Sequence, residues 1–428
     1  MNFYPEKILA LLIVILFLVR KINKTFFYFV LVIGLFVVYY FTLQNSEFFK
    51  SLFIIATMAT VYLSQNSREI LNDFKTQFAL LSLGILMGSM LLVSAQSFFA
   101  AYLALELIAI FSMVLTLTPK NEIISSEAGV KWVIYGAISS GIMLYGISHI
   151  YGLLGTTEFV HLNYLNESQR NIFLGSFLLF FVGIGFKLAT VPFHMWAPDV
   201  FEATPVAANL LFAVVPKLSA LVILAKITNI FFGMNSEIHT RWVTLIQFVA
   251  FITMLLGNFS AINQQSIKRM FAYAGIAQMG VLLFVYDQLF YYALLYLFSI
   301  ITAYIVINFV VERFDSDNLE RFNGLIKKYP VMAICLTLSL FSLITFAAPF
   351  SIISAAIQKQ NYGIALITVL NLIAAMYYYL KLIGNMVFKE PETDEKIVGF
   401  NYLNQLVVVG ICLPVVLLSV FCIKNIFN

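Results

Sequence analysis

Residues 186–220 read FKLATVPFHMWAPDVFEATPVAANLLFAVVPKLSA and place two lysines, Lys187 and Lys217, in strongly apolar surroundings. A charged side chain inside a bilayer is costly, so it usually lines a water-filled path or pairs with another charge. Pro192 and Pro216 lie close to the two lysines. Because proline removes a backbone hydrogen bond, each opens its helix to water or to a side chain. Broken helices that carry charges are typical of proteins that move ions across membranes, and this stretch predicts such a protein.

The apolar character extends over the whole chain. Of its 428 residues, 61% are hydrophobic and only 11% are charged, a balance that no soluble domain has. Apolar runs near the roughly 20 residues that cross a membrane recur about fourteen times. The longest polar stretches, 312–329 and 389–399, are too short for a domain outside the membrane. The predicted fold is therefore an all-α polytopic membrane protein with about fourteen transmembrane helices.

Lysine and arginine residues in the predicted loops indicate the orientation of the chain. One side holds most of them, including Arg20, Lys120 and Arg269. Because cytoplasmic loops are enriched in these residues, this side is predicted to face the cytoplasm or the mitochondrial matrix. Both termini are then predicted to lie on the outer, periplasmic side.

The chain offers few ligands for a metal or a redox group. Its three cysteines, Cys335, Cys412 and Cys422, are scattered through apolar runs without a paired spacing, which argues against an iron–sulfur cluster or a zinc site. The four histidines are too dispersed to bind haem in pairs, and no glycine-rich nucleotide motif follows a strand. We therefore predict that this chain binds no cofactor and no metal, and that any redox chemistry belongs to a partner.

Glu106 is an acid deep inside an apolar run. In the run 97–117 it lies about 14 Å from the start, near the midplane of a hydrocarbon core of about 30 Å. No cation lies close to it on the same helix, so we expect its partner to come from another helix. The alternative is a protonated glutamic acid that only hydrogen-bonds between helices.

Lys217 also lies at mid-depth in its run, 205–230, too deep for its side chain to reach the surface by snorkelling. A buried lysine can release and regain its proton, which an arginine cannot do, and Lys217 is therefore predicted to relay protons. Lys187 is predicted to do the same, because it precedes the break at Pro192 and its run continues beyond that break to Trp196.

Three other lysines lie nearer to the ends of their helices. Lys131 is near the start of the run 128–154, so snorkelling to the interface competes with a role in the relay. Lys226 and Lys381 lie within reach of their helix ends, and both are predicted to snorkel.

Three titratable residues follow the break at Pro192. His194 can exchange protons near neutral pH, but a lone histidine at the interface can equally be structural. Asp199 and Glu202 precede the next helix. We expect them to cap that helix and to complement its dipole. The alternative is that they collect protons at a channel mouth.

The opening stretch resembles a signature of the antiporter-like membrane subunits of respiratory complex I, and more narrowly of subunit N, the relative of mitochondrial subunit 2. Further stretches carry the same resemblance: FFAAYLALELIAIFSM around Glu106, SSEAGVKWVIYGAISSGIMLYGISHIYG around Lys131, GNFSAINQQSIKRMFAYAGIAQMG and MYYYLKLIGNMVFKEPE. The resemblance covers about residues 77–390, and the order of the predicted spans is similar to that of the family.

The resemblance implies an internal symmetry. Two inverted five-helix repeats would occupy residues 77–230 and 242–388, after three N-terminal transmembrane helices in 1–76 and before a C-terminal one in 402–424. One helix of each repeat would be broken, near Pro192 and near Pro349.

The resemblance also implies a function. Such subunits translocate protons while NADH is oxidised by quinone, and Glu106, Lys131, Lys187 and Lys217 match the acid and the lysines of the family's relay. The FMN, the iron–sulfur clusters, NADH and quinone would then belong to partner subunits. The implied partners are other membrane subunits of complex I, especially neighbouring antiporter-like ones, and the lipid bilayer, with no nucleic acid. The implied location is the bacterial inner membrane or, alternatively, the mitochondrial inner membrane.

Two positions depart from the family's pattern in the second repeat. Gln278 stands where the family usually has a histidine, and Ala355 where it usually has a lysine. Lys359, four residues after Ala355, is a further candidate for a relay, although a solvated lysine near the outer surface is the simpler expectation. Two other functions stay open: a cation/proton antiporter subunit without a redox partner, and a structural subunit with an inactive second half-channel.

Overall fold

The computed structural model describes most of the chain. The described residues are 4–20, 24–117, 122–159, 167–232, 237–284, 289–345, 347–358, 362–391, 408–415 and 417. They form helices and two isolated β-bridges, with no strand among them. The predicted all-helical membrane protein is thus confirmed. The chain divides into two compact units, Met1–Val249 and Ala250–Asn428.

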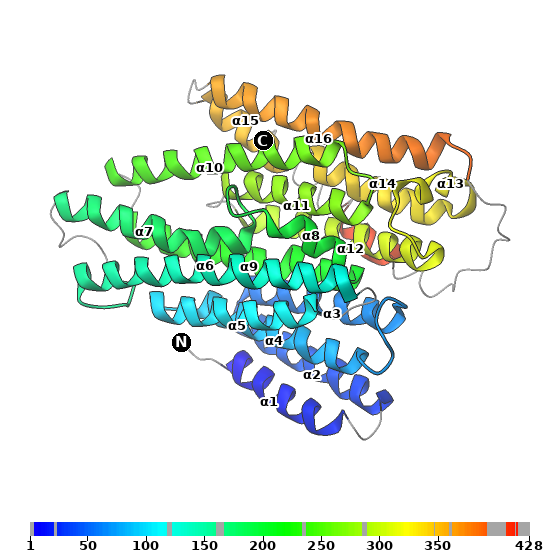
Figure 1. The fold of residues 1–428 in the computed structure, drawn as a ribbon, viewed down its shortest axis with the longest axis horizontal. Coiled ribbons are helices and arrows are strands. Elements are labelled where there is room, and N and C mark those ends of the chain that lie inside the picture. Colours follow the sequence, from blue (N-terminus) through cyan, green and yellow to red (C-terminus); the bar gives the residue numbers. More distant parts are fainter. Residues whose placement is uncertain are drawn as a thin grey trace. The chain divides into compact units, whose positions relative to one another are not determined.

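The first unit contains nine helices and the start of a tenth among its described residues (Figure 1). They are α1 (Tyr4–Val19), α2 (Lys24–Gln44), α3 (Phe48–Asn66), α4 (Lys75–Ser94), α5 (Phe98–Thr116), α6 (Glu122–Leu154), α7 (Glu167–Leu188), α8 (Trp196–Ala203), α9 (Val206–Phe232) and α10 (Glu237–Ile262).

Helix α9 is the centre of the first unit. In its candidate span, Val206–Phe231, 83% of the residues are buried, against 28% in α2 and α6. A helix that is apolar on all sides is stable only when other helices surround it, and α3, α4, α5 and α7 all pack against α9. Lys217 therefore lies on the best-covered helix of this unit.

The second unit begins within α10. Its further described elements are α11 (Ile267–Phe284), α12 (Leu289–Phe314), the 3-10 helix η3 (Leu319–Phe322), α13 (Leu325–Lys328), α14 (Pro330–Thr345), α15 (Ala347–Gln358) and α16 (Tyr362–Phe388). The expected C-terminal helix, 402–424, falls mostly outside the described residues, although residues 408–415 are helical.

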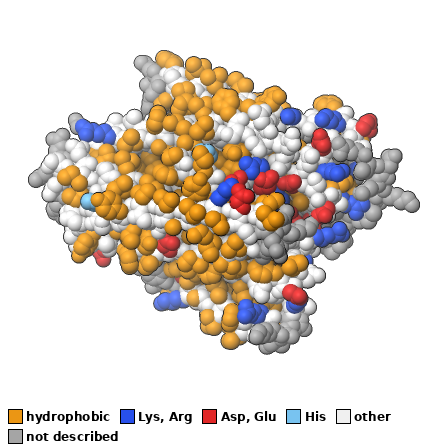
Figure 2. All heavy atoms as spheres, viewed as in Figure 1, with side chains coloured by type: hydrophobic (Ala, Val, Ile, Leu, Met, Phe, Trp, Pro, Cys, Tyr) orange, Lys and Arg blue, Asp and Glu red, His pale blue; other side chains and the backbone are white. Residues whose placement is uncertain are grey.

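Eleven helices of the described chain are long and apolar enough to cross a membrane. The other three predicted spans differ from this pattern for separate reasons. The first, 8–19, is the 16-residue α1, the span 331–357 is divided into α14 and α15, and 402–424 is described only in part. Apolar side chains face outward, as lipid requires, and Figure 2 shows them over most of the face that it displays.

The predicted break near Pro192 is present. α7 ends at Leu188, where Ala189 takes a left-handed φ of 56°, and α8 begins at Trp196. Near Pro349, α14 is described up to Thr345 and α15 from Ala347, and the residue between them lies outside the described residues, so the second break stays a prediction. The inverted symmetry of the two repeats and their predicted bounds stay predictions.

Candidate functional site

Glu106 and Lys187 line one cavity of the first unit. The cavity has a volume of about 180 Å³ and lies between α5, α6 and α7. Its wall is mostly apolar, with hydroxyl groups from Ser139 and Ser140. Lys187 is buried, with 5% of its surface exposed, and Glu106 is half-buried. The structure thus brings the predicted acid together with a lysine from another helix.

The ammonium group of Lys187 lies over aromatic rings. Its Nζ is 5.2 Å from the ring centres of both Trp132 and Phe186, which favours a cation. Among the described residues this Nζ has no hydrogen-bond partner, so Glu106 does not bond to it directly. Glu106 is nevertheless near enough to interact with it electrostatically. The two groups act on each other across the cavity.

Lys217 is the second buried lysine. It follows Pro216 inside α9, and only 1% of its surface is exposed. Its Nζ lies 5.6 Å from the ring centre of Phe201 in α8 and lacks a hydrogen-bond partner within the described parts of the chain. An ammonium group without a fixed acceptor is not bound into a permanent ion pair, and such a group is suited to proton exchange.

One side chain and one backbone N–H donate to the free carbonyl groups where α7 ends. A helix leaves its last carbonyl groups without helical partners. Trp196 donates from Nε1 to the carbonyl oxygen of Phe186 at 3.0 Å. The backbone N–H of Thr190 donates to the carbonyl oxygen of Gly185 at 2.9 Å. The break is therefore stable although it is buried, and it holds Lys187 at the last turn of α7.

Lys131 is placed differently from the buried lysines. Its side chain is 36% exposed and forms ion pairs with Asp199 at 2.6 Å and with Glu127 at 2.7 Å. One N–H at the start of α9 is capped from elsewhere, because Oε2 of Glu69 accepts from the N–H of Val206 at 2.8 Å, and capping by Asp199 and Glu202 stays a prediction. Asp199 lies in the first turn of α8 and joins α8 to α6.

Glu127 and Glu69 were missed by the sequence analysis. Glu127 was detectable, because it precedes Lys131 by four residues and so lies on the same face of the helix. Glu69 lies in the loop between α3 and α4, 137 residues before Val206, and no local pattern indicates that contact. Glu202 is half-buried in α8. His194 lies in the turn between α7 and α8, and its buried Nδ1 has no hydrogen-bond partner among the described residues.

Neutral polar side chains of the second unit bond to one another and to the end of α14. Gln278 of α11 donates from Nε2 to the carbonyl oxygen of Leu343 near the end of α14, at 2.8 Å. Asn258 of α10 donates to Oδ1 of Asn371 at 2.8 Å and accepts from the hydroxyl of Tyr378 at 2.9 Å. The candidate Lys359 and the side chain of Ala355 lie outside the described residues.

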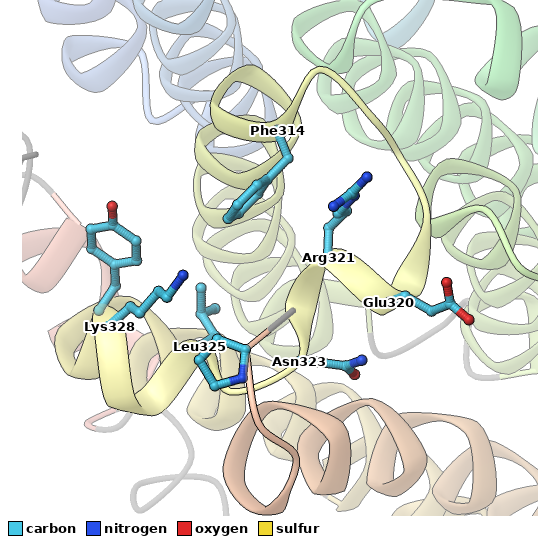
Figure 3. Close-up of a pocket in the computed structure, with 8 residues that line it drawn as sticks. Phe314, Glu320, Arg321, Asn323, Leu325 and Lys328 are labelled. Atoms are coloured by element: carbon cyan, nitrogen blue, oxygen red, sulfur yellow. The ribbon is translucent and has the colours of Figure 1, made fainter. Parts of the chain in front are cut away.

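Two further cavities lie in the second unit. One, of about 390 Å³, is lined by Gln264, Tyr378 and the exposed Lys381, among others. The other, shown in Figure 3, lies between Phe314, Arg321 and Lys328 and measures about 10 Å³, which leaves room for no more than about one water molecule. Neither contains a buried unpaired lysine comparable to Lys187 or Lys217.

Known proteins have sequences similar to this one over most of its length. Residues 95–374 match the family model described as "NADH:quinone oxidoreductase/Mrp antiporter, TM". NADH-quinone oxidoreductase subunit N of Rhodospirillum rubrum is 32% identical over 364 residues, which cover 81% of this chain and 74% of that protein. Subunit N of Bacillus anthracis is 32% identical over 383 residues, covering 82% and 75%.

Solved structures share the fold. A chain of respiratory complex I from Thermus thermophilus matches with a TM-score of 0.82 at 23% identity, covering 97% of this chain and 96% of that one. A chain of an archaeal membrane-bound sulfane sulfur reductase matches with a TM-score of 0.86 at 20% identity, covering 99% and 94%. The sequence matches place the chain more narrowly: it belongs to the subunit N family of NADH-quinone oxidoreductases, within the NADH:quinone oxidoreductase/Mrp antiporter transmembrane proteins.

Proposed function

We propose that this chain is a proton-translocating, antiporter-like membrane subunit of an NADH-quinone oxidoreductase of the complex I type. The observation that carries the proposal is the pair of buried lysines, Lys187 and Lys217. Their ammonium groups are 5% exposed or less, and neither has a hydrogen-bond partner in the described chain. A structural membrane protein has no use for two such costly charges.

The proposed chemistry is proton exchange between buried side chains and water. Glu106 supports the positive charge of Lys187 across their cavity. When the carboxylate is neutralised, that support is lost and Lys187 passes its proton on, with Lys217 as the next carrier. Lys131 and Asp199 form an ion pair that is about one-third exposed and are assigned to exchange with water. His194 and Glu202 are further candidates on the same segment.

The energy for this transport comes from outside the chain. Moving one charge across the membrane costs about 2.3 kcal/mol per 100 mV, and we assign its supply to quinone reduction in partner subunits. FMN, iron–sulfur clusters, NADH and quinone are placed in those subunits, and this chain is assigned no cofactor of its own. The relatives are bacterial, which supports a place in a bacterial inner membrane beside other antiporter-like subunits. Both termini are proposed to lie on the periplasmic side.

A second function is favoured by one observation in the second unit. Gln278 cannot hold and release a proton as histidine does, and its amide is bound to the carbonyl of Leu343. A subunit whose second half-channel is closed would relay charge without exporting a proton along the usual route. The cation/proton antiporter without a redox partner stays the alternative from another class.

Purification of the tagged chain from its host membranes tests the proposal. We expect it to bring down flavin- and iron–sulfur-containing subunits, and the reconstituted complex to pump protons when NADH is added. Purification without these subunits, together with sodium/proton exchange driven by a pH gradient, would instead support the antiporter. An assembled complex that pumps normally when Lys217 is replaced by Met would support a purely structural role.

A further inference from the structure

A second group of charges lies buried in the first unit, away from the lysines of the relay. Glu6 of α1 is 2% exposed and Lys50 of α3 is 4% exposed. Lys50 Nζ contacts Oε1 of Glu6 at 2.6 Å and Oε1 of Glu47 at 2.5 Å, and Ser94 Oγ donates to Oε1 of Glu6 at 2.7 Å. We refer to Glu6, Glu47, Lys50 and Ser94 as the α1–α3–α4 cluster.

The two acids of this cluster are incompletely bonded. In each, Oε1 is bonded to Lys50, while Oε2 is buried and has no partner among the described residues. A buried carboxylate oxygen without a donor is costly when the group is ionised. The same oxygen is less costly when it carries a proton, because it is then neutral and can donate a hydrogen bond itself. The cluster thus holds two acids against one ammonium group, so it has a place for one further proton.

A fifth residue connects the cluster to the helix of the relay. Lys226 of α9 donates to the carbonyl oxygen of Ala95 at 2.6 Å, at the end of α4, and is close enough to Lys50 for the two charges to interact. Lys226 is nine residues after Lys217 on the same helix, a rise of about 14 Å. The ammonium group of Lys226 is thus held by a carbonyl that follows α4, and the prediction that it snorkels to the interface stays a prediction.

The cluster also has a graded access to water. The side chain of Glu6 is 2% exposed and that of Lys50 is 5% exposed, whereas the side chain of Glu47 is 24% exposed. Within the cluster Glu47 is therefore the acid nearest to water, and Lys226 of α9 is partly exposed as well. A proton can leave the cluster through Glu47.

We propose that Glu6 and Glu47 share one exchangeable proton across Lys50, and that this cluster is the proton-release group of the first unit. This inference rests on the proposed function. In the loading step a carboxylate oxygen takes a proton from the Lys226 ammonium group, which becomes a neutral amine. In the release step Glu47 gives a proton to water and returns to the carboxylate, and Lys226 is reprotonated from the relay. An outlet in the first unit would also remove the need for titratable groups at the positions of Gln278 and Ala355.

The assembled oxidoreductase in proteoliposomes provides the test, through two readouts. One is the ratio of protons pumped to NADH oxidised, and the other is the infrared absorption of a protonated carboxylic acid. Glu6→Gln is the informative variant, because it keeps the shape and leaves one acid facing one base. Glu158→Gln is the matched control, since Glu158 is an exposed acid of the same unit.

In Glu6→Gln we expect the carboxylic acid band to be lost and the proton ratio to fall, while assembly and NADH oxidation stay at the level of the Glu158→Gln control. Glu6→Asp, which keeps an acid, should retain both the band and part of the pumping. An unchanged band in Glu6→Gln would overturn the shared proton, and an unchanged proton ratio would overturn its role in release.

Lys217→Met separates this inference from the proposed function on which it rests. If Lys217→Met stops pumping and Glu6→Gln does not change it, only the release group is wrong. If Lys217→Met itself has no effect on pumping, the proposed function fails, and with it the role in release.

Discussion

The described ends of α7 and α14 have the same kind of backbone contact, with different chemistry beside it. At the end of α7, Trp196 donates to the carbonyl of Phe186, two residues before the last residue of the helix. At the end of α14, Gln278 donates to the carbonyl of Leu343, which is also two residues before the last one. The next residue is Lys187 in the first unit and Ile344 in the second.

This comparison separates two roles that a broken helix can have. Breaking a helix inside a membrane requires donors for the freed carbonyls, and both units supply one. Moving protons requires in addition a group that can change its charge, and of these two helix ends only that of α7 has one as the adjacent residue, Lys187. The end of α14 has a donor for its carbonyl although the adjacent Ile344 cannot change its charge.

The largest effect is expected from removing the central lysine. A positioned acid–base group contributes roughly 100-fold or more to a proton-transfer step, so Lys217→Met should lower pumping by at least about tenfold. Lys217→Arg should do nearly the same, because arginine keeps the charge but does not deprotonate. Proton uptake by proteoliposomes measures both, with Lys381→Met of the second unit as the control. Normal pumping by the arginine variant would show that Lys217 acts only as a fixed positive charge and does not relay protons.

A partial effect is expected from Glu106→Gln. Two charges in contact at 4 Å interact by roughly 4 kcal/mol at an effective dielectric constant of about 20. Glu106 and Lys187 act across a cavity without a direct bond, so their interaction is weaker. We expect coupled NADH oxidation to fall clearly while the complex still assembles, as judged by native electrophoresis. Full activity in an assembled variant would show that Lys187 does not depend on this acid.

In the second unit, we expect the substitution Gln278→Ala to lower the stability of the complex without changing proton transport. Gln278→Ala leaves the buried carbonyl of Leu343 without its donor, which costs about 1–3 kcal/mol. If the second half-channel is closed, the proton ratio of the assembled complex stays unchanged and only its thermal inactivation is faster. A fall in the proton ratio would instead make Gln278 part of a working path. Gln278→Asn, which keeps the amide on a shorter side chain, is the control.

The smallest effect is expected from Asp199→Asn, at the partly exposed ion pair with Lys131. The ion pair of Lys131 and Asp199 is about one-third exposed, and pairs of this kind contribute about 0–1 kcal/mol. In Asp199→Asn, Lys131 keeps its bond to Glu127. We therefore expect almost unchanged stability in thermal inactivation and a slower proton exchange with water. A large loss of stability would mean that the pair holds α6 and α8 together.

The buried lysines were predictable because their signal is local. A charge in the middle of an apolar run and a proline nearby can be read directly, and this led to Lys187, Lys217 and the break at Pro192. The partner of Lys131 and the contact of Glu69 with the start of α9 were not predictable, because Asp199 and Glu69 act on segments distant in sequence. Near a helix end, a lysine that binds carbonyls gives the same local pattern as one that snorkels, so the sequence of Lys226 does not separate the two.

Helix α6 makes the site of the first unit sensitive to the thickness of the bilayer. Its 33 residues span about 50 Å, well beyond a hydrocarbon core of about 30 Å. A helix that is too long tilts or protrudes, and the tilt changes with the length of the lipid chains. Because Trp132, Gly136 and Met143 of α6 line the cavity of Glu106 and Lys187, thinner or thicker membranes would reshape that cavity. Lipid composition is thus a variable that can tune coupling without any change of sequence.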